Sequence, residues 1–289
     1  MTEPQTATIE AVEVAATAPL SAWERVKLAR HAGRPHTLDY IHELFTGFVE
    51  LHGDRAFGDD MALIGGIGTF RGRSVLVLGH QKGANTRDNL ARNFGMPRPE
   101  GYRKARRLMA HAEKFALPII TFIDTPAADP GIGSEERGQG TAIAESLLAM
   151  AGLRVPIVTA VIGEGGSGGA LAISLGDRLL MLENAVYAVA SPEACAAILW
   201  KDASRASMAA ETMRVTAADL DRFEIIDELI PEPVAAHEAP RETILAVGEA
   251  VARHLDELVT DFDPDDETAV ERLLAARYEK FRRIGAWTE

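Results

Sequence analysis

The spacing of apolar residues predicts how the first part of the chain folds. Over residues 21–52 they recur every three or four positions, which predicts helices, with Ser21 as an N-cap and Phe48 still inside the helical pattern. Residues 61–70 and 73–79 are rich in apolar and β-branched residues and predict two strands. Arg71-Gly72 between them indicates a tight turn, so the two strands are expected to form a hairpin.

The middle of the chain repeats one pattern twice. Each copy has a short apolar strand, then a loop rich in glycine or proline, then a helix. The predicted parts are strands at 119–123 and 156–162, loops at 124–133 and 163–169, and helices at 134–151 and after 169. Because consecutive strand–helix units place their strands in parallel with right-handed crossovers, the pattern predicts an α/β fold with a parallel sheet.

Other segments complete the expected organisation. Residues 1–20 are acidic and rich in Ala and Thr, so they are expected to be a flexible tail rather than a signal peptide. The expected main domain is 21–240, and 241–289 is expected to be a helical extension. The remaining predicted elements are a loop at 83–99, a helix at 100–116 with Ala105, Leu108, Ala112 and Phe115 on one face, strands near 178–182 and 186–190, a helix from Ser191 to Trp200, and a break near 261–266.

Composition narrows the class of protein. The 289 residues are 47% apolar and 25% charged, which is typical of a globular α/β protein with a sizeable core. A net charge of -13 argues against general affinity for nucleic acids. A single cysteine, Cys195, excludes an intrachain disulfide and a cysteine zinc cluster. With no apolar run long enough for a membrane span, a cytoplasmic location is expected.

Residues 163–169 are the strongest candidate for chemistry. Five glycines fall within these seven positions, between a predicted strand and a predicted helix. Glycine permits positive φ and close approach of backbone to a ligand, and N–H groups at a helix start attract negative charge. The segment therefore indicates a site for an anion or an oxyanion. The alternative is tight packing against another part of the chain.

Three motifs compete for this glycine segment. A P-loop needs Lys followed by Ser or Thr, which the segment lacks. Gly163, Gly165 and Gly168 match the dinucleotide fingerprint, but the following helix is short for that fold. The third interpretation is an oxyanion hole, in which two N–H groups hold charge that develops on a carbonyl oxygen.

Two further regions could take part in binding. Residues 122–131 follow a buried strand at the end where ligands gather in parallel sheets, and Asp124 is expected to anchor that loop. The stretch from Lys82 to Arg107 carries an excess of basic residues, among them Arg92 and Arg103. These could bind the phosphates of a CoA, the acidic surface of a partner or the carboxylate of a carrier, or they could form a solvated face.

Several long motifs resemble the carboxyltransferase alpha subunits of multisubunit bacterial acetyl-CoA carboxylase. The matching segments are 34–40, 53–55, 79–83, 92–97, 99–105, 135–139, 163–169 and 191–193, and they extend over most of 21–233. The resemblance implies a crotonase (ClpP-like) fold, a spiral of repeated ββα units with flanking helices. It also implies that Gly168 and Gly169 are the glycine pair that holds the ureido oxygen of biotin.

The resemblance implies an activity and partners. The family moves a carboxyl group from carboxybiotin on a carrier protein to acetyl-CoA, giving malonyl-CoA for fatty acid biosynthesis in an ATP-dependent complex. The implied partners are a beta subunit with a zinc ribbon, the biotin carboxyl carrier protein and biotin carboxylase, with an α2β2 core and no metal in this chain. The implied binding residues are Gly165, Gly166, Ser167, Pro126, Ala127, Asp129, Lys82, Arg92 and Arg103.

The chain departs from the family pattern in one loop. Ala127 stands where the family has glycine, and Asp129 stands where it has tyrosine. Two alternatives therefore stay open: a paralogous carboxyltransferase or decarboxylase subunit for another acyl-CoA, and a non-catalytic scaffold. The intact Gly168-Gly169 pair argues against the scaffold.

Overall fold

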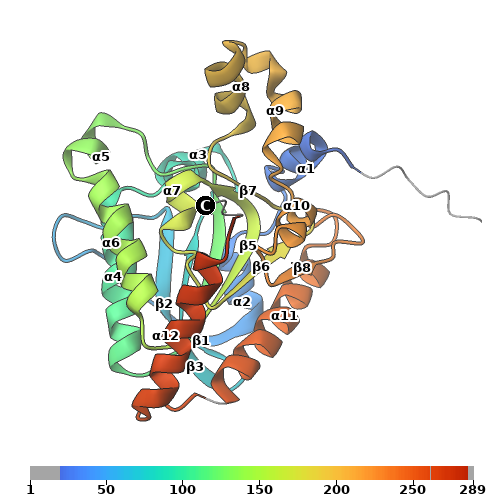
Figure 1. The fold of residues 1–289 in the computed structure, drawn as a ribbon. Helices are drawn as coiled ribbons and strands as arrows, with labels where there is room; N and C mark the ends of the chain where they lie inside the picture. Colours follow the sequence, from blue (N-terminus) through green and yellow to red (C-terminus); the bar gives the residue numbers. More distant parts are fainter. Residues whose placement is uncertain (1–19, 261, 286–289) are drawn as a thin grey trace, which may run out of the picture.

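A sheet of eight strands forms the centre of the computed structural model, which describes residues 20–260 and 262–285 (Figure 1). The strands are β1 (Phe45–Glu50), β2 (Leu63–Phe70), β3 (Arg73–His80), β4 (Ile119–Thr125), β5 (Ile157–Gly166), β6 (Arg178–Leu182), β7 (Val186–Ala188) and β8 (Glu228–Ile230). Their order is β1-β2-β3-β4-β5-β6-β8, and β7 pairs with β5 outside this path.

The sheet is antiparallel at one edge and parallel elsewhere. β1, β2 and β3 pair antiparallel, and the pairs from β3 through β4, β5 and β6 to β8 are parallel. The predicted hairpin is confirmed: its turn has φ of 46° at Arg71 and 81° at Gly72, as a type I′ turn requires. The predicted parallel sheet is also confirmed, and every residue of β4 is buried, as expected for a strand covered on both faces.

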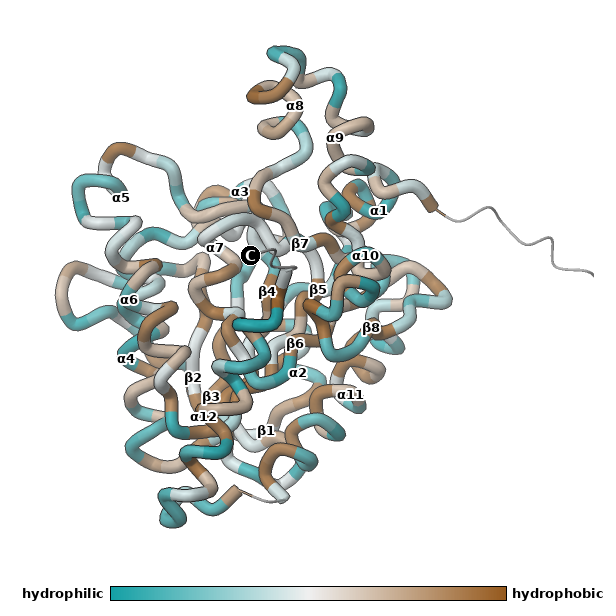
Figure 2. The backbone as a smooth tube through the Cα atoms, in the orientation of Figure 1, coloured by the Kyte–Doolittle hydropathy of each residue, from teal (hydrophilic) through white to brown (hydrophobic). Residues whose placement is uncertain are grey.

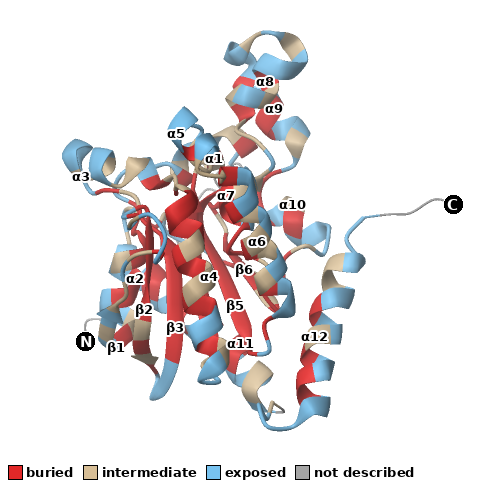
Figure 3. Ribbon diagram, turned by 90° about the vertical axis from the view of Figure 1, so that its left-hand side faces the viewer, coloured by how far each residue is buried: buried red, intermediate tan, exposed pale blue. Residues whose placement is uncertain are grey.

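Helices cover both faces of the sheet. They are α1 (Ala22–Ala29), α2 (Thr37–Leu44), α3 (Thr86–Ala91), α4 (Pro99–Lys114), α5 (Ile132–Glu136), α6 (Gln139–Gly152), α7 (Ser167–Leu171), α8 (Pro192–Trp200), α9 (Ala206–Met213), α10 (Ala217–Arg222), α11 (Pro240–Thr260) and α12 (Glu267–Arg282). α2 and α11 pack together on one face, and α4 and α6 pack together on the other (Figure 1). Figure 3 shows that β3 and β5 are buried along most of their length.

The C-terminal helices pack on this domain. Val247, Val251 and Leu255 of α11 belong to the same hydrophobic core as the strands. α12 lies against α6, where the buried guanidinium of Arg277 pairs with Asp177. The predicted break between two charged helices is confirmed, because α11 ends at Thr260 and α12 begins at Glu267. Both helices pack on the same domain as the sheet.

The pair formed by α8 and α9 projects from the sheet. Ser191 caps α8 by accepting a hydrogen bond from the N–H of Ala194, so the predicted helix from Ser191 to Trp200 is confirmed. Ile198 and Leu199 at its end are 66% and 60% exposed. Figure 2 shows an apolar stretch of α8 beside polar segments at the top of this pair, apart from the apolar strands of the centre.

Three local predictions are wrong, each because of a backbone conformation. The first helical region ends at Leu44, and Phe48 lies on strand β1, whose Gly47 has a φ of 61° that no helix contains. The single helix predicted at 134–151 is divided into α5 and α6 by Gly138, with a φ of 82°. Asn85 caps a short helix, α3, inside the predicted loop at 83–99.

Two further differences concern the edges of predicted elements. Phe115, expected on the buried face of the helix at 100–116, is 56% exposed because α4 ends at Lys114 and turns away there. The glycine segment is not wholly a loop. β5 continues to Gly166, and its last residues pair with β7.

Candidate active site

The carboxyl ends of the parallel strands bring the sequence motifs together. Lys82 follows β3, Asp124 is near the end of β4, and Glu164 is near the end of β5. β5 changes neighbours along its length: residues 158–161 pair with β6, and residues 164–166 pair with β7. The end of β5 thus lies between β4, where Gly165 pairs with Thr125, and β7, and the short helix α7 starts directly after it.

The strand-to-helix junction is a strained turn at the start of a short helix. Ser167 is exposed and has a φ of 53°, which is uncommon for a residue other than glycine. No side chain caps α7. Because the first N–H groups of a helix have no partner within it, Ser167, Gly168 and Gly169 present donors at this end.

Different physical reasons require the glycines of this segment. A Cβ on Gly166 would lie 1.9 Å from the carbonyl oxygen of Pro126, and one on Gly169 would lie 2.4 Å from the backbone nitrogen of Ala128. Both glycines are therefore needed for packing against the loop after β4. A Cβ on Gly168 would meet only the Ile143 side chain, at 3.6 Å, which is ordinary contact. Packing within the described part of the chain does not require glycine at 168.

This geometry corrects one sequence expectation. Positive φ was expected at the glycines, but within the segment only Ser167 has it. At Gly169 the close approach to Ala128 means that any side chain displaces the neighbouring loop. Gly168 is therefore the one glycine of this segment at which a substitution can test ligand binding without disturbing folding.

An apolar groove of about 580 Å³ begins at this junction. Ser167 and Gly168 lie on its wall, together with Tyr187 from β7. The other side is formed largely by Val189, Met213 and Phe223. The groove thus joins the start of α7, at Ser167 and Gly168, to a mainly apolar surface that also includes Arg214.

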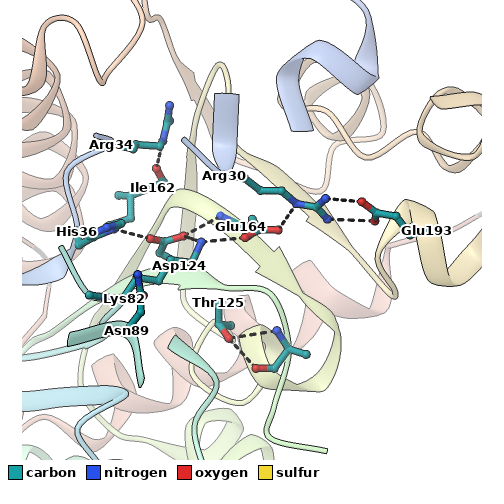
Figure 4. A network of polar contacts seen from close by, with 12 residues as sticks. Arg30, Arg34, His36, Lys82, Asn89, Asp124, Thr125, Ile162, Glu164 and Glu193 are labelled. Atoms are coloured by element: carbon teal, nitrogen blue, oxygen red, sulfur yellow. Dashed lines mark hydrogen bonds and ion pairs between the residues drawn. The ribbon is translucent and has the colours of Figure 1, made fainter. Parts of the chain in front are cut away.

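A buried ion network lies behind the glycine segment (Figure 4). Asp124 accepts hydrogen bonds from the Lys82 ammonium at 2.7 Å and from the backbone N–H of Glu164 at 3.0 Å. The Lys82 ammonium also donates to the Glu164 carboxylate at 2.8 Å. The network therefore ties together the ends of β3, β4 and β5.

The network extends to residues far away in the sequence. His36 Nδ1 lies 3.0 Å from Asp124 Oδ2, and Arg30 bonds Glu164 at 2.7 Å and Glu193 at 2.6 Å (Figure 4). Arg30, from the end of α1, thereby links β5 to α8. Sequence reasoning missed His36, Arg30 and Glu164, because their pairing joins segments up to 163 positions apart.

Charge pairing keeps Asp124 and Lys82 ionised. Burial alone would raise the pKa of Asp124, but Lys82 and His36 outweigh it and hold that pKa well below its usual range. Burial alone would lower the pKa of Lys82, but Asp124 and Glu164 outweigh it and raise that pKa. The predicted anchoring role of Asp124 agrees with this arrangement.

The basic residues predicted to bind an anion are engaged within the chain. Lys82 is in the network, Arg103 pairs with Asp54 at 2.8 Å, and Arg92 pairs with Asp88 at 2.9 Å. Arg103 is also 3.6 Å from Glu100. Because carboxylates already neutralise these cations, direct anion binding by them remains a prediction, and the geometry does not favour it for Lys82 or Arg103.

The loop after β4 packs against the glycine segment. Pro126 and Ala127 contribute the backbone against which Gly166 and Gly169 pack. Ala127 does not have a positive φ, so the family glycine is not required there. Asp129 accepts a hydrogen bond from Ser134 at 2.5 Å and lies 3.8 Å from Arg98, so its side chain holds its own loop.

Residues 20–260 and 262–285 contain neither a candidate metal site nor a candidate membrane span. No group of three or more His, Cys, Asp or Glu side chains there is placed to hold a metal ion. None of the helices described is long and apolar enough to cross a membrane.

Comparison with known protein sequences gives close relatives. The chain is 55% identical over 273 residues to the acetyl-coenzyme A carboxylase carboxyl transferase subunit alpha of Geobacter metallireducens, covering 94% of this chain and 84% of the relative. The subunit of the same name from Anoxybacillus flavithermus is 55% identical over 284 residues, covering 98% of this chain and 85% of that one. The Thermus thermophilus subunit is 52% identical over 271 residues, covering 93% and 84%.

Solved structures support the fold. The chain matches transcarboxylase 12S, solved with methylmalonyl-coenzyme A and methylmalonic acid bound, with a TM-score of 0.61 at 18% identity, over 80% of this chain but only 44% of that one. The beta subunit of geranyl-CoA carboxylase from P. aeruginosa matches with a TM-score of 0.58 at 17% identity, over 81% of this chain and 45% of that one. The predicted crotonase-like α/β fold is thus confirmed. Residues 4–285 match the family described as acetyl co-enzyme A carboxylase carboxyltransferase-like, and the chain belongs to that family.

Proposed function

We propose that this chain is the alpha subunit of a biotin-dependent carboxyltransferase that moves a carboxyl group from biotin on a carrier protein to acetyl-CoA, giving malonyl-CoA. Relatives at 55% identity bear the name of that subunit. The observation that carries the proposal is Gly168, which lines the groove although packing does not demand a glycine there. A glycine without a packing reason beside exposed N–H groups fits a ligand that approaches the backbone.

The residues at the head of α7 fit a biotin ring. The ring system is compact and largely apolar with one polar urea, and the groove has apolar walls and N–H donors at one end. When bound, biotin would supply the carboxyl group in a transferable form. The chain would hold the urea oxygen through the N–H groups of Gly168 and Gly169, and a Cβ at Gly168 would occupy that space.

These N–H groups provide the catalytic contribution of the chain. They are fixed before the ligand arrives, so they stabilise negative charge on an oxygen without reorganisation in the reaction. Removing one such donor typically costs a factor of about 100 to 1,000 in turnover. No side-chain acid or base of this chain is needed in this account. The acyl-CoA is assigned to a beta subunit of the same complex.

The altered loop supports acetyl-CoA rather than a different acyl group. Asp129 bonds Ser134 through its side chain and Pro97 through its backbone N–H, at 2.5 Å and 3.0 Å. Its charge is thus satisfied within the loop and need not face a developing enolate. We therefore propose that the substitution of aspartate for tyrosine leaves the substrate class unchanged.

Reconstitution tests this function. The chain is combined with a beta subunit, biotin carboxyl carrier protein and biotin carboxylase, and malonyl-CoA is measured with ATP and bicarbonate. We expect malonyl-CoA only when both carboxyltransferase subunits are present. Parallel reactions with propionyl-CoA and longer acyl-CoA esters test the paralogue. An assembled complex without activity on any ester would favour the scaffold and contradict the proposal.

A further inference from the structure

The carbonyl oxygen of Gly169 is held by two buried side chains, one from β3 and one from α4, a helix that packs on β3. His80 Nε2, at the end of β3, lies 3.1 Å from this oxygen, and the hydroxyl of Tyr102, on α4, donates to it at 3.3 Å. Both side chains belong to residues that are 0% exposed. Neither residue has a role in the function proposed above.

The shortness of α7 explains why this oxygen needs partners. α7 has only five residues. The N–H of Ala172 bonds the oxygen of Gly168 at 3.0 Å, and the N–H of Ile173 bonds that of Ala170 at 3.3 Å. The helical hydrogen bonds therefore leave out the oxygen of Gly169. A buried carbonyl without a hydrogen-bond partner would be destabilising.

The protonation state of His80 is fixed by its surroundings. Burial lowers the pKa of His80 to about 4, so the ring is neutral near neutral pH and carries one N–H. A carbonyl oxygen only accepts, so that N–H must be on Nε2. Consistent with this, His80 Nδ1 is buried and has no hydrogen-bond partner within residues 20–260 and 262–285.

We propose that His80 and Tyr102 are positioning residues that clamp the Gly169 carbonyl and thereby orient the N–H groups of Gly168 and Gly169. This rests on the proposed function for its catalytic part. Two adjacent glycines give the backbone unusual freedom, which works against a preorganised donor pair. C=O and N–H groups in a helical turn lie along one axis, so holding one carbonyl fixes the direction of the donors.

The clamp complements the packing of the same glycine. The Cα of Gly169 rests on the backbone of Ala127 and Ala128, which limits translation of the turn. The two hydrogen bonds to its oxygen limit rotation about that contact. The sequence motifs that contain His80 and Tyr102 thus act on the glycine segment from β3 and α4.

Tyr102→Phe is the main test, and Tyr40→Phe is its matched control. Both tyrosines are 0% exposed, but the Tyr40 hydroxyl has no hydrogen-bond partner among the residues that the structure describes. Hydrogen–deuterium exchange of the amides at 170–173 is measured in the full chain. We expect Tyr102→Phe to increase exchange there by a factor of about five, which corresponds to one lost hydrogen bond, and Tyr40→Phe to leave it unchanged.

Kinetics of the reconstituted complex give the second measurement. We expect Tyr102→Phe to reduce kcat about tenfold, with the KM for the carrier within about twofold, because orientation and not binding is lost. His80→Leu should act in the same direction, and His80→Gln, which can present an amide N–H, should recover part of kcat.

The outcomes separate the clamp from the proposed function. Unchanged exchange in Tyr102→Phe overturns the clamp, whatever the kinetics. Faster exchange with unchanged kcat overturns its link to catalysis. An inactive wild-type complex refutes the proposed function instead, and the exchange measurement still decides whether the carbonyl is clamped.

Discussion

Two buried aspartates hold the opposite ends of β5 and belong to ion networks of different character. At the amino end, Asp177 accepts the N–H of Ile157 at 2.7 Å and pairs with Arg277. At the carboxyl end, Asp124 accepts the N–H of Glu164 at 3.0 Å and pairs with Lys82. Both arrangements place a carboxylate on a strand N–H and a cation on the carboxylate.

The two networks differ in how far their polar groups are bonded within the protein and shielded from solvent. The Arg277 side chain is 1% exposed, and its remaining donors bond the carbonyls of Met150, Leu153 and Val155. Lys82 instead connects through Glu164 to Arg30, and these residues border an opening of about 290 Å³. Because ligands gather at the carboxyl ends of parallel strands, we assign the closed network to stability and the open one to site geometry.

Arg277→Met should have the largest effect on stability. It leaves Asp177 buried without its cation, and removing one partner of a buried pair costs about 3 to 5 kcal/mol. We expect the upper part of that range in denaturant unfolding, with unchanged turnover per folded molecule. Arg154→Met is the control, because its pair with Glu267 is exposed and its loss should change the free energy of unfolding far less. Equal losses in both variants would remove the distinction between closed and surface pairs.

Lys82→Met should affect both stability and transfer. Loss of the ammonium leaves the carboxylates of Asp124 and Glu164 facing each other without a cation. The free energy of unfolding should therefore fall by about 3 kcal/mol, and carboxyl transfer should fall because the end of β5 shifts. Arg106→Met, which breaks an exposed pair with Glu145, controls for loss of a cation. If the folded Lys82 variant transfers carboxyl groups at the wild-type rate, the open network has no role in site geometry.

His80 should make folding stability depend on pH. Its ordinary pKa is about 6.5, and burial lowers it to about 4, so the unfolded chain binds a proton that the folded chain does not. Stability from this group is complete above about pH 6.5 and decreases as the pH falls towards 4. Wild type should lose about 2 kcal/mol more than His80→Gln between about pH 7 and about pH 5 in denaturant unfolding. Equal losses of stability in the wild type and in His80→Gln would mean that His80 titrates normally in the folded chain.

The sequence predicted the parts of the fold that local pattern determines. The apolar runs of β4 and β5 are the signature of buried parallel strands, and Arg71-Gly72 specified its hairpin. Strand β1 was missed because Phe45 and Phe48 continue helical spacing, and the backbone bulges at Gly47.

The candidate site was predicted in outline only. The glycine segment and Asp124 were found because a strand, a turn and a helix start are visible locally. The partners of Asp124 were not, because His36 is 88 positions away in the sequence. Nor does sequence distinguish Gly168 from Gly169, since only the positions of Ala128 and Ile143 show which glycine is free of packing constraints.

The most direct test of the account is Gly168→Ala compared with Gly152→Ala. Neither site presents a close contact to a Cβ, and Gly152 lies at the far end of α6. We expect both variants to change the free energy of unfolding by less than about 1 kcal/mol and to assemble with the beta subunit. Only Gly168→Ala should reduce carboxyl transfer, by about a hundredfold. Wild-type turnover by an assembled Gly168→Ala complex would contradict the assignment of the active site to this glycine segment.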